Sequence, residues 1–136
     1  MSVGIVVVSH SAKLAEGVVE MASQMAGEVR IRAAGGTDDG GMGTDATLIA
    51  SAIAEADSGD GVLVVVDLGS AVLSAQLAIE ELVGAERRDR VRVADAPLVE
   101  GAVIAAIQSS TGSGLEEVDA AARGAASMSK TKDLAG

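Results

Sequence analysis

Several side-chain types are missing from this sequence. Its 136 residues include no Phe, Tyr, Trp or Cys, and only one Pro and one His. The absence of cysteine excludes disulfides, thiolate catalysis and Cys-ligated metals, and a single histidine argues against a zinc site. Without aromatic rings, nothing can stack on nucleic-acid bases. The core must be built from Val, Leu, Ile, Ala and Met.

Positive charge is also scarce. Ten Lys and Arg face twenty Asp and Glu, for a net charge of −10. This charge opposes binding to nucleic acid and favours a basic protein partner. The longest apolar runs, Ile5–Val8 and Val62–Val66, are far too short to cross a membrane. Because the N-terminus also lacks the pattern of a signal peptide, we expect a soluble, cytoplasmic protein with no membrane partner.

Short β-branched runs alternate with segments of helical period. Val3–Val8 and Val62–Val66 are continuous apolar runs, typical of strands buried on both faces. Residues 28–34 and 90–94 alternate charged and apolar side chains, which is typical of strands nearer a sheet edge. Helical patterns fill the intervals, and Ser113–Glu116 resembles a capping box that opens a fifth helix.

Four apolar stripes mark the expected buried faces of the helices. The stripes consist of Leu14, Val18, Met21 and Met25; Leu48, Ile49, Ala52, Ile53 and Ala56; Leu73, Leu77 and Leu82; and Leu98 to Ile107. The alternation of strands and helices predicts an α/β fold: a single doubly wound domain over residues 1–126. We expect a central, mainly parallel four-stranded sheet in the order 2-1-3-4, with helices on both faces. Residues 127–136 lack periodicity and are expected to form a frayed C-terminal tail.

Ligands of such a sheet collect beyond the carboxyl ends of its strands. His10 directly follows the first buried strand, and Asp67 ends the other strongly apolar one. If these strands are neighbours, the carboxylate can accept a hydrogen bond from one imidazole nitrogen and leave the other as a nucleophile. The alternatives are that His10 is a surface residue that helps to cap the next helix, and that Asp67 is only a helix cap.

Two further segments flank these residues. Gly69-Ser70-Ala71 opens the third helix, where free backbone N–H groups attract anions, and Ser70 either caps that helix or donates to a phosphate. The glycine-rich loop 35–43 runs into Thr44-Asp45, a helix cap. Its glycines let backbone approach a ligand or partner, or the loop is a mobile connector.

Several other chemistries lack support. Gly41–Ala46 fits the G-x-G-x-x-A form of a dinucleotide site, but nine residues separate Ala34 from Thr44, where that site needs a tight turn. The sequence contains no P-loop and no nucleophile elbow. A magnesium site built from Asp38, Asp39 and Asp45 has no support beyond composition.

Four ordered segments carry a family resemblance. Val7–Ser11, Gly43–Asp45, Val66–Ala71 and Ala96–Ala102 resemble the phosphotransferase subunits (DhaM) of phosphoenolpyruvate-dependent dihydroxyacetone kinases. These subunits are similar to the mannose-type IIA domain of the sugar phosphotransferase system. The match runs from residue 3 to about residue 125.

The resemblance implies that His10 is phosphorylated and that Asp67 orients it. The phosphoryl group would come from the carrier protein HPr and pass to ADP on the nucleotide-binding kinase subunit, sustaining phosphorylation of dihydroxyacetone on a third subunit. No cofactor or metal is expected on this chain, because ADP/ATP and Mg²⁺ would sit on the partner. A homodimer is also implied. The candidate phosphate- or partner-contacting residues are Ser9, Ser11, Gly43, Thr44, Asp45, Gly69, Ser70 and Ala71.

Two other functions remain open from the sequence. One is a mannose-type IIA component of a sugar transporter, which shares the expected fold. The other is a small-ligand-binding regulatory module in which His10 is never modified. The segments Asp67–Ala71 and Ala96–Gly101 favour the kinase subunit over the sugar-transport component.

Overall fold

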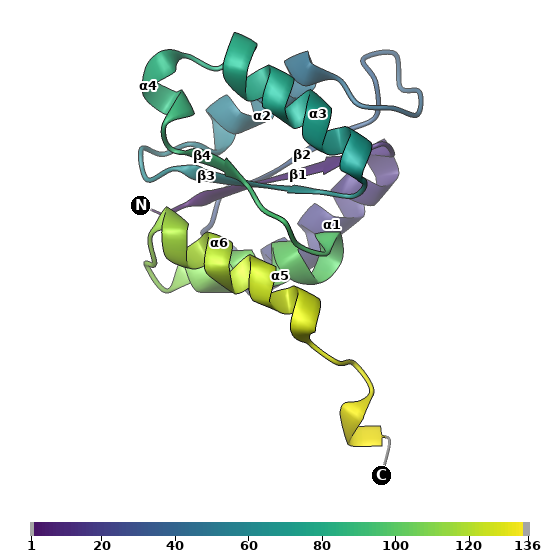
Figure 1. The fold of residues 1–136 in the computed structure, drawn as a ribbon, viewed down its shortest axis with the longest axis vertical. Helices are drawn as coiled ribbons and strands as arrows, with labels where there is room; N and C mark the ends of the chain where they lie inside the picture. Colours follow the sequence, from purple (N-terminus) through teal and green to yellow (C-terminus); the bar gives the residue numbers. More distant parts are fainter. Residues whose placement is uncertain (1, 135–136) are drawn as a thin grey trace.

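A computed structural model describes residues 2–134 of the chain (Figure 1). The elements follow in the order β1 (Gly4–Ser9), α1 (Ala12–Met25), β2 (Ile31–Gly35), α2 (Ala46–Ala56), β3 (Val62–Val66), α3 (Gly69–Leu77), the π-helical turn η1 (Ala78–Leu82), α4 (Ala85–Arg88), β4 (Val91–Val93), α5 (Leu98–Ser110), α6 (Leu115–Gly124) and the 3-10 turns η2 (Ala125–Ser127) and η3 (Lys132–Leu134).

The four strands form one sheet in the order β2-β1-β3-β4, and all three pairings are parallel. The expected α/β fold and strand order are therefore confirmed. β1 and β3 are the two central strands and consist almost entirely of buried residues. From β1 the chain crosses to β2 on one side, and from β2 it returns past β1 to β3 on the other side. The crossovers therefore diverge between β1 and β3, which opens a crevice at the carboxyl ends of these two strands.

Helices cover both faces of the sheet, as the alternation of elements predicts (Figure 1). Alternate residues of β1 supply the two cores: Ile5 and Val7 pack with α1, α5 and α6, and Val6 and Val8 pack with α2 and α3. The helix positions against the sheet are mostly alanine and valine. Small side chains let the helices approach the sheet closely, so a core without aromatic rings is still filled.

The expected buried face of α1 is confirmed at Val18 and wrong at its other three positions. Ala15, Val18 and Ala22 face the core, whereas Leu14, Met21 and Met25 are half-exposed. The helix packs closely on β2 and α5, where alanine fits and the longer Leu and Met side chains do not. The buried stripe is therefore displaced by one position from the stripe of the largest apolar residues.

The third helical segment also differs from the expectation. It runs as α3 and then η1 rather than as one regular helix, and Leu73, Leu77 and Leu82 are exposed. Its buried positions are Ala71, Ala75 and Ala78. The short α4, which the sequence did not indicate, follows before β4.

The predicted capping box at Ser113–Glu116 is shifted by one residue. The N-cap of α6 is Gly114, whose N–H donates to the Glu117 side chain at 3.3 Å. Ser113 instead accepts a hydrogen bond from the Gln108 side chain at 2.7 Å. Glycine has no side chain with which to cap, so only one of the two reciprocal bonds of the box exists.

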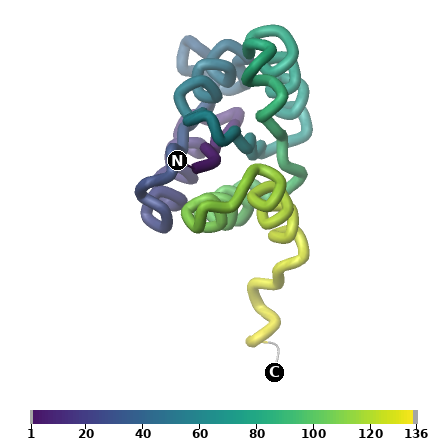
Figure 2. Tube along the Cα trace, turned by 90° about the vertical axis from the view of Figure 1, so that its left-hand side faces the viewer, coloured from purple at the N-terminus to yellow at the C-terminus, as the bar shows by residue number. Residues whose placement is uncertain are grey.

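The C-terminal segment extends away from the domain after η2 (Figures 1 and 2). An ion pair between Lys130 and Glu100 of α5 ties it to the body. The expectation that residues 127–136 are frayed stays a prediction, and positions 135 and 136 lie outside the described residues. No helix within residues 2–134 combines the length and the apolar character that crossing a bilayer requires.

Candidate functional site

The carboxyl ends of the two central strands bring His10 and Asp67 together. Val8 of β1 pairs with Val66 of β3, so the next residues on each strand leave the sheet side by side. The Asp67 N–H donates to the Val8 carbonyl at 3.2 Å, which continues the pairing to the edge. His10 and Asp67 are 57 positions apart in the sequence but adjacent in space.

The Asp67 carboxylate holds His10 at two points. Its Oδ1 lies 3.0 Å from the imidazole Nδ1, and its Oδ2 accepts the His10 backbone N–H at 2.9 Å. The buried Ser9 hydroxyl donates to Oδ2 at 3.0 Å, and the Leu68 N–H donates to Oδ1 at 2.7 Å. Backbone and ring of the histidine are thus fixed by the same acid.

These hydrogen bonds keep Asp67 ionised. Burial acts to raise the pKa of the Asp67 carboxyl, but the bonds from His10, Ser9 and Leu68 together lower it below its usual value. A carboxylate accepts but cannot donate, so the proton between the two side chains belongs to Nδ1. The neutral imidazole therefore carries its lone pair on Nε2.

Nε2 faces Ser70 in the first turn of α3. The Ser70 Oγ lies 2.9 Å from Nε2 and is the donor, because Nδ1 already holds the ring proton. The His10 side chain remains about one quarter exposed (24%), and Ser70 is exposed. Nε2 is therefore available to an incoming group once the hydroxyl turns aside.

The start of α3 presents open donors beside this nitrogen. Gly69 and Ser70 are the first two residues of the helix, whose N–H groups have no intrahelical acceptor. Neither N–H has a hydrogen-bond partner within the described part of the chain. Both residues are exposed. An anion at Nε2 would meet these N–H groups and the positive end of the helix dipole.

The glycine-rich loop is attached to the site. The Gly43 N–H donates to the His10 carbonyl at 2.9 Å, and the Gly36 N–H donates to the Ser9 carbonyl at 3.1 Å. Gly43 has a φ of +137°, a conformation that favours glycine. Next to it, the hydroxyls of Thr44 and Ser74 are 2.5 Å apart, which joins the loop to α3.

The geometry narrows the predicted set of phosphate-contacting residues. Three of its members use their polar groups internally. Ser9 is buried with its hydroxyl on Asp67, Ala71 is buried with its N–H on the Leu68 carbonyl, and the Gly43 N–H is taken by His10. These polar groups therefore contribute to holding the site together. Gly69 and Ser70 of the predicted set have backbone N–H groups with no partner among the described residues, and the Ser70 hydroxyl lies 2.9 Å from Nε2.

Two other members of that set are helix caps. The Ser11 hydroxyl accepts from the Leu14 N–H at 3.2 Å, and Asp45 accepts from the N–H groups of Thr47 and Leu48. Asp39 is used in the loop, where it accepts from Thr37 and from the Gly41 N–H. Within residues 2–134, no group of three or more acidic or histidine side chains is arranged to hold a metal ion.

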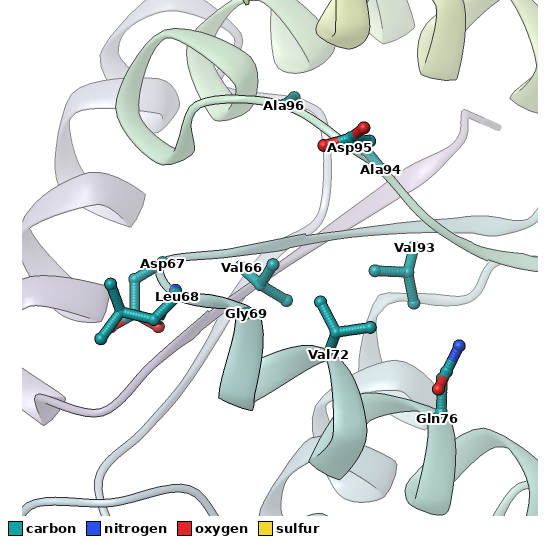
Figure 3. A pocket seen from close by; sticks show the side chains of 10 residues that line it. All are labelled: Val66, Asp67, Leu68, Gly69, Val72, Gln76, Val93, Ala94, Asp95 and Ala96. Atoms are coloured by element: carbon teal, nitrogen blue, oxygen red, sulfur yellow. Dashed lines mark hydrogen bonds between the residues drawn. The ribbon is translucent and has the colours of Figure 1, made fainter.

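Asp67 also lines a hollow of about 400 Å³ (Figure 3). It lies between α3 and the segment after β4, and most of its lining was absent from the predicted set. The residues that line it are Val66, Asp67, Leu68, Gly69, Val72, Gln76, Val93, Ala94, Asp95 and Ala96. The signal that could have found it is the position of Asp95, two residues after the end of the fourth strand.

The fold that carries this histidine–aspartate pair is that of a phosphotransferase-system IIA domain. The model of the family described as PTS system fructose IIA component, EIIA-man, matches residues 4–119. The chain belongs to this family.

Curated relatives within it are DhaM subunits. The phosphoryl donor subunit DhaM of PEP-dependent dihydroxyacetone kinase 2 from Listeria innocua is 46% identical over 108 residues, which are 79% of this chain and 86% of the relative. The phosphoryl donor subunit DhaM from Escherichia coli is 42% identical over 120 residues, or 85% of this chain. Those residues cover 25% of the Escherichia coli protein, so this chain corresponds to one part of it.

Solved structures share the fold. The crystal structure of a protein of unknown function is 40% identical and superposes with a TM-score of 0.81 over 90% of this chain and 94% of the other. A sigma-54 interaction domain protein from Enterococcus faecalis gives a TM-score of 0.63 at 18% identity, over 86% of this chain and 84% of the other. The second likeness concerns the fold alone.

Proposed function

We propose that this chain is the phosphoryl donor subunit of a phosphoenolpyruvate-dependent dihydroxyacetone kinase and that His10 carries the phosphoryl group. One observation carries the proposal: the Asp67 carboxylate holds Nδ1 at 3.0 Å, while Nε2 lies 2.9 Å from the exposed Ser70 hydroxyl at the start of α3. The DhaM relatives are named as subunits of a dihydroxyacetone kinase, and this supports the assignment of such a phosphoryl group to a kinase system.

The transfer step needs little from the protein beyond position and charge. The lone pair of Nε2 attacks phosphorus, a P–N bond forms, and the bond to the leaving atom of the donor breaks with its electron pair returning to the donor. Nδ1 keeps its proton throughout, and Asp67 stabilises the positive charge that the ring gains. Ser70 and the N–H groups of Gly69 and Ser70 then face the phosphoryl oxygens.

The donor in this proposal is phosphorylated HPr, and the acceptor is ADP on the nucleotide-binding kinase subunit. ATP re-formed there would phosphorylate dihydroxyacetone on a third subunit. The nucleotide and Mg²⁺ would belong to the partner, and no cofactor is assigned to this chain. A cytoplasmic location and a homodimer are part of the same proposal. Sedimentation of the purified chain would test the homodimer.

The decisive experiment is phosphorylation followed by a chase. The chain is incubated with phosphoenolpyruvate, enzyme I and HPr, and its intact mass is measured. We expect a gain of one phosphoryl group that is lost in acid and is absent in His10→Ala. Adding the kinase subunits, ADP and dihydroxyacetone should then discharge the chain and produce dihydroxyacetone phosphate.

Two results would count against the proposal. No mass gain under these conditions would reject the phosphohistidine. A gain that the kinase subunits cannot discharge, but that a sugar-transport IIB component can, would assign the chain to sugar transport instead.

A further inference from the structure

The hollow beside Asp67 has mixed chemical character. Its walls are apolar, with Val66 and Val93 from the strands and Val72 from α3. Its polar lining consists of two carboxylates, Asp67 and Asp95, and the Gln76 amide, with no cationic side chain among them. In Figure 3, Asp95 lies on one rim and α3 forms the opposite rim.

The two carboxylates differ in how many hydrogen-bond partners they already have. Asp67 already accepts hydrogen bonds from Ser9, His10 and Leu68. Asp95 is exposed, and its carboxylate has no hydrogen-bond or ion-pair partner among residues 2–134. The hollow therefore offers an apolar wall that ends in one uncompensated negative charge.

From this character we infer an interaction surface: the hollow receives a long cationic side chain, arginine or lysine, of the protein that delivers the phosphoryl group to His10. The aliphatic stem would lie along Val72 and Val93, and the charged head would reach the Asp95 carboxylate. The inference rests on the proposed function, because it gives the phosphoryl donor a way to dock.

The chemistry of the lining favours a protein side chain over a small ligand. A phosphate or nucleotide would meet two carboxylates in a chain of net charge −10. A quaternary ammonium ligand is bound by aromatic rings, and the chain has none. Leu68, 60% exposed at the rim, adds an apolar contact of the kind that a protein surface covers.

The position of the hollow suits a docking anchor. Asp67 and Gly69 line it; Asp67 also contacts the imidazole, and Gly69 begins α3. A partner held there lies beside the residues that frame the transfer site. Anchoring the partner at this place would position its phosphoryl group without occupying the transfer site itself.

The test uses charge reversal and two phosphoryl donors. Asp95→Lys and Asp95→Asn are compared with Asp89→Lys, a matched control at an exposed aspartate before the other end of β4. Each variant is phosphorylated by phosphorylated HPr and, separately, by phosphoramidate, which needs no protein docking. We expect Asp95→Lys to lower the ratio of the HPr rate to the phosphoramidate rate about tenfold, Asp95→Asn to lower it less, and Asp89→Lys to change it under about twofold.

Each outcome has a separate meaning. A ratio for Asp95→Lys equal to that of Asp89→Lys would overturn the docking surface, and so would a defect confined to the onward transfer to ADP. Loss of the phosphoramidate reaction in the unaltered chain would instead overturn the phosphohistidine. Circular dichroism of each variant separates these results from misfolding, and Asp95→Asn keeps the side-chain shape if the lysine is not tolerated.

Discussion

At the scale of single residues, Asp67 does more than any other side chain to define the site. Its two oxygens accept from two N–H groups of the backbone, from the Ser9 hydroxyl and from the imidazole of His10. The acid therefore sets the direction of the strand ends, the orientation of the ring and its tautomer together. A substitution that keeps the shape of Asp67 but removes its charge tests these effects together.

Asp67→Asn should slow phosphorylation of His10 by about tenfold to a hundredfold, as for other partners that orient a histidine. One carboxamide oxygen cannot accept all four bonds, and its NH2 group favours the tautomer in which Nδ1 is unprotonated. Rapid-quench transfer from phosphorylated HPr measures the rate, and the ¹⁵N shifts of the ring report the tautomer. Asp89→Asn serves as the control, and an unchanged rate for Asp67→Asn would remove Asp67 from the mechanism.

Ser70 occupies the nitrogen that has to react. Its hydroxyl donates to a neutral Nε2 in the free chain, a bond of about 1 kcal/mol, whereas a bond to a charged phosphoryl oxygen contributes about 1.5–3 kcal/mol. Ser70→Ala removes the bond in both states, and it therefore destabilises the phosphorylated chain by roughly 1 kcal/mol more than the free chain.

The Ser70→Ala equilibrium with phosphorylated HPr should therefore shift about fivefold away from phosphorylated His10. The ratio of the two phosphorylated proteins, measured by intact mass at equilibrium, tests this. Ser51→Ala, at an exposed serine on α2, is the control. An equilibrium that moves toward phosphorylated His10 would mean that Ser70 acts only as a block.

The meeting of His10 and Asp67 at one site could be predicted, because both residues follow buried strands. His10 and Asp67 each come directly after or at the end of an apolar run, and the parallel sheet places such ends together. The use of each polar group could not be predicted. Whether Ser9 faces the ligand or the acid depends on which way β1 leaves the sheet, and the sequence does not contain that information.

At the scale of elements, the loop between β2 and α2 supports the histidine through its backbone. Gly43 and Gly40 both have positive φ, +137° and +86°, so a side chain strains either position. They differ in their surroundings. A Cβ on Gly43 would lie 3.0 Å from the Thr37 methyl group and next to the bond to His10, whereas a Cβ on Gly40 meets open space.

We expect Gly43→Ala and Gly40→Ala each to lower the free energy of unfolding by about 1–3 kcal/mol. Only Gly43→Ala should also slow phosphorylation of His10, because only its N–H fixes the His10 carbonyl. Urea unfolding and the transfer rate, measured on both variants, give the comparison. Equal transfer rates would show that the loop contributes stability alone.

The faces of the helices were the least predictable feature of the elements. The spacing of large apolar residues predicts that Leu14, Met21 and Met25 lie in the core, but the buried residues of α1 are alanine and valine. Where helices pack closely on a sheet, side-chain size opposes burial at the nearest positions. The alternation of strands and helices survives this error, because it depends on periods and lengths rather than on which face is buried.

At the scale of the whole molecule, the two ends of the sheet carry different polar groups. The carboxyl ends of the strands hold His10 and Asp67, whereas a cluster of ion pairs around the buried Asp57 lies before β3 and β4. The Asp57 side chain is 1% exposed and pairs with Arg87 at 2.8 Å and with Arg90 at 2.7 Å. The cluster joins the end of α2 to the segment before β4, and so connects elements distant in sequence.

Asp57 should therefore govern stability in acid without affecting transfer. Burial acts to raise the pKa of Asp57, but the hydrogen bonds from Arg90 and Arg87 lower it far below its usual value. Because the folded pKa is below the unfolded value of about 3.9, the stabilisation is present above about pH 4 and is lost as the pH falls through the folded pKa.

Asp57→Asn should lower the free energy of unfolding at pH 7 by about 3 kcal/mol, since it leaves two guanidinium groups without their partner. The gap between the variant and the unaltered chain should stay constant from neutral pH down to about pH 5 and narrow below about pH 4. Urea unfolding across this range measures the gap, with Asp60→Asn, at an exposed aspartate, as a control expected to stay within about 0.5 kcal/mol. Curves that remain parallel in acid would mean that the Asp57 pairs do not set the acid limit, and a loss of phosphoryl transfer in the folded variant would mean that the two ends of the sheet are coupled.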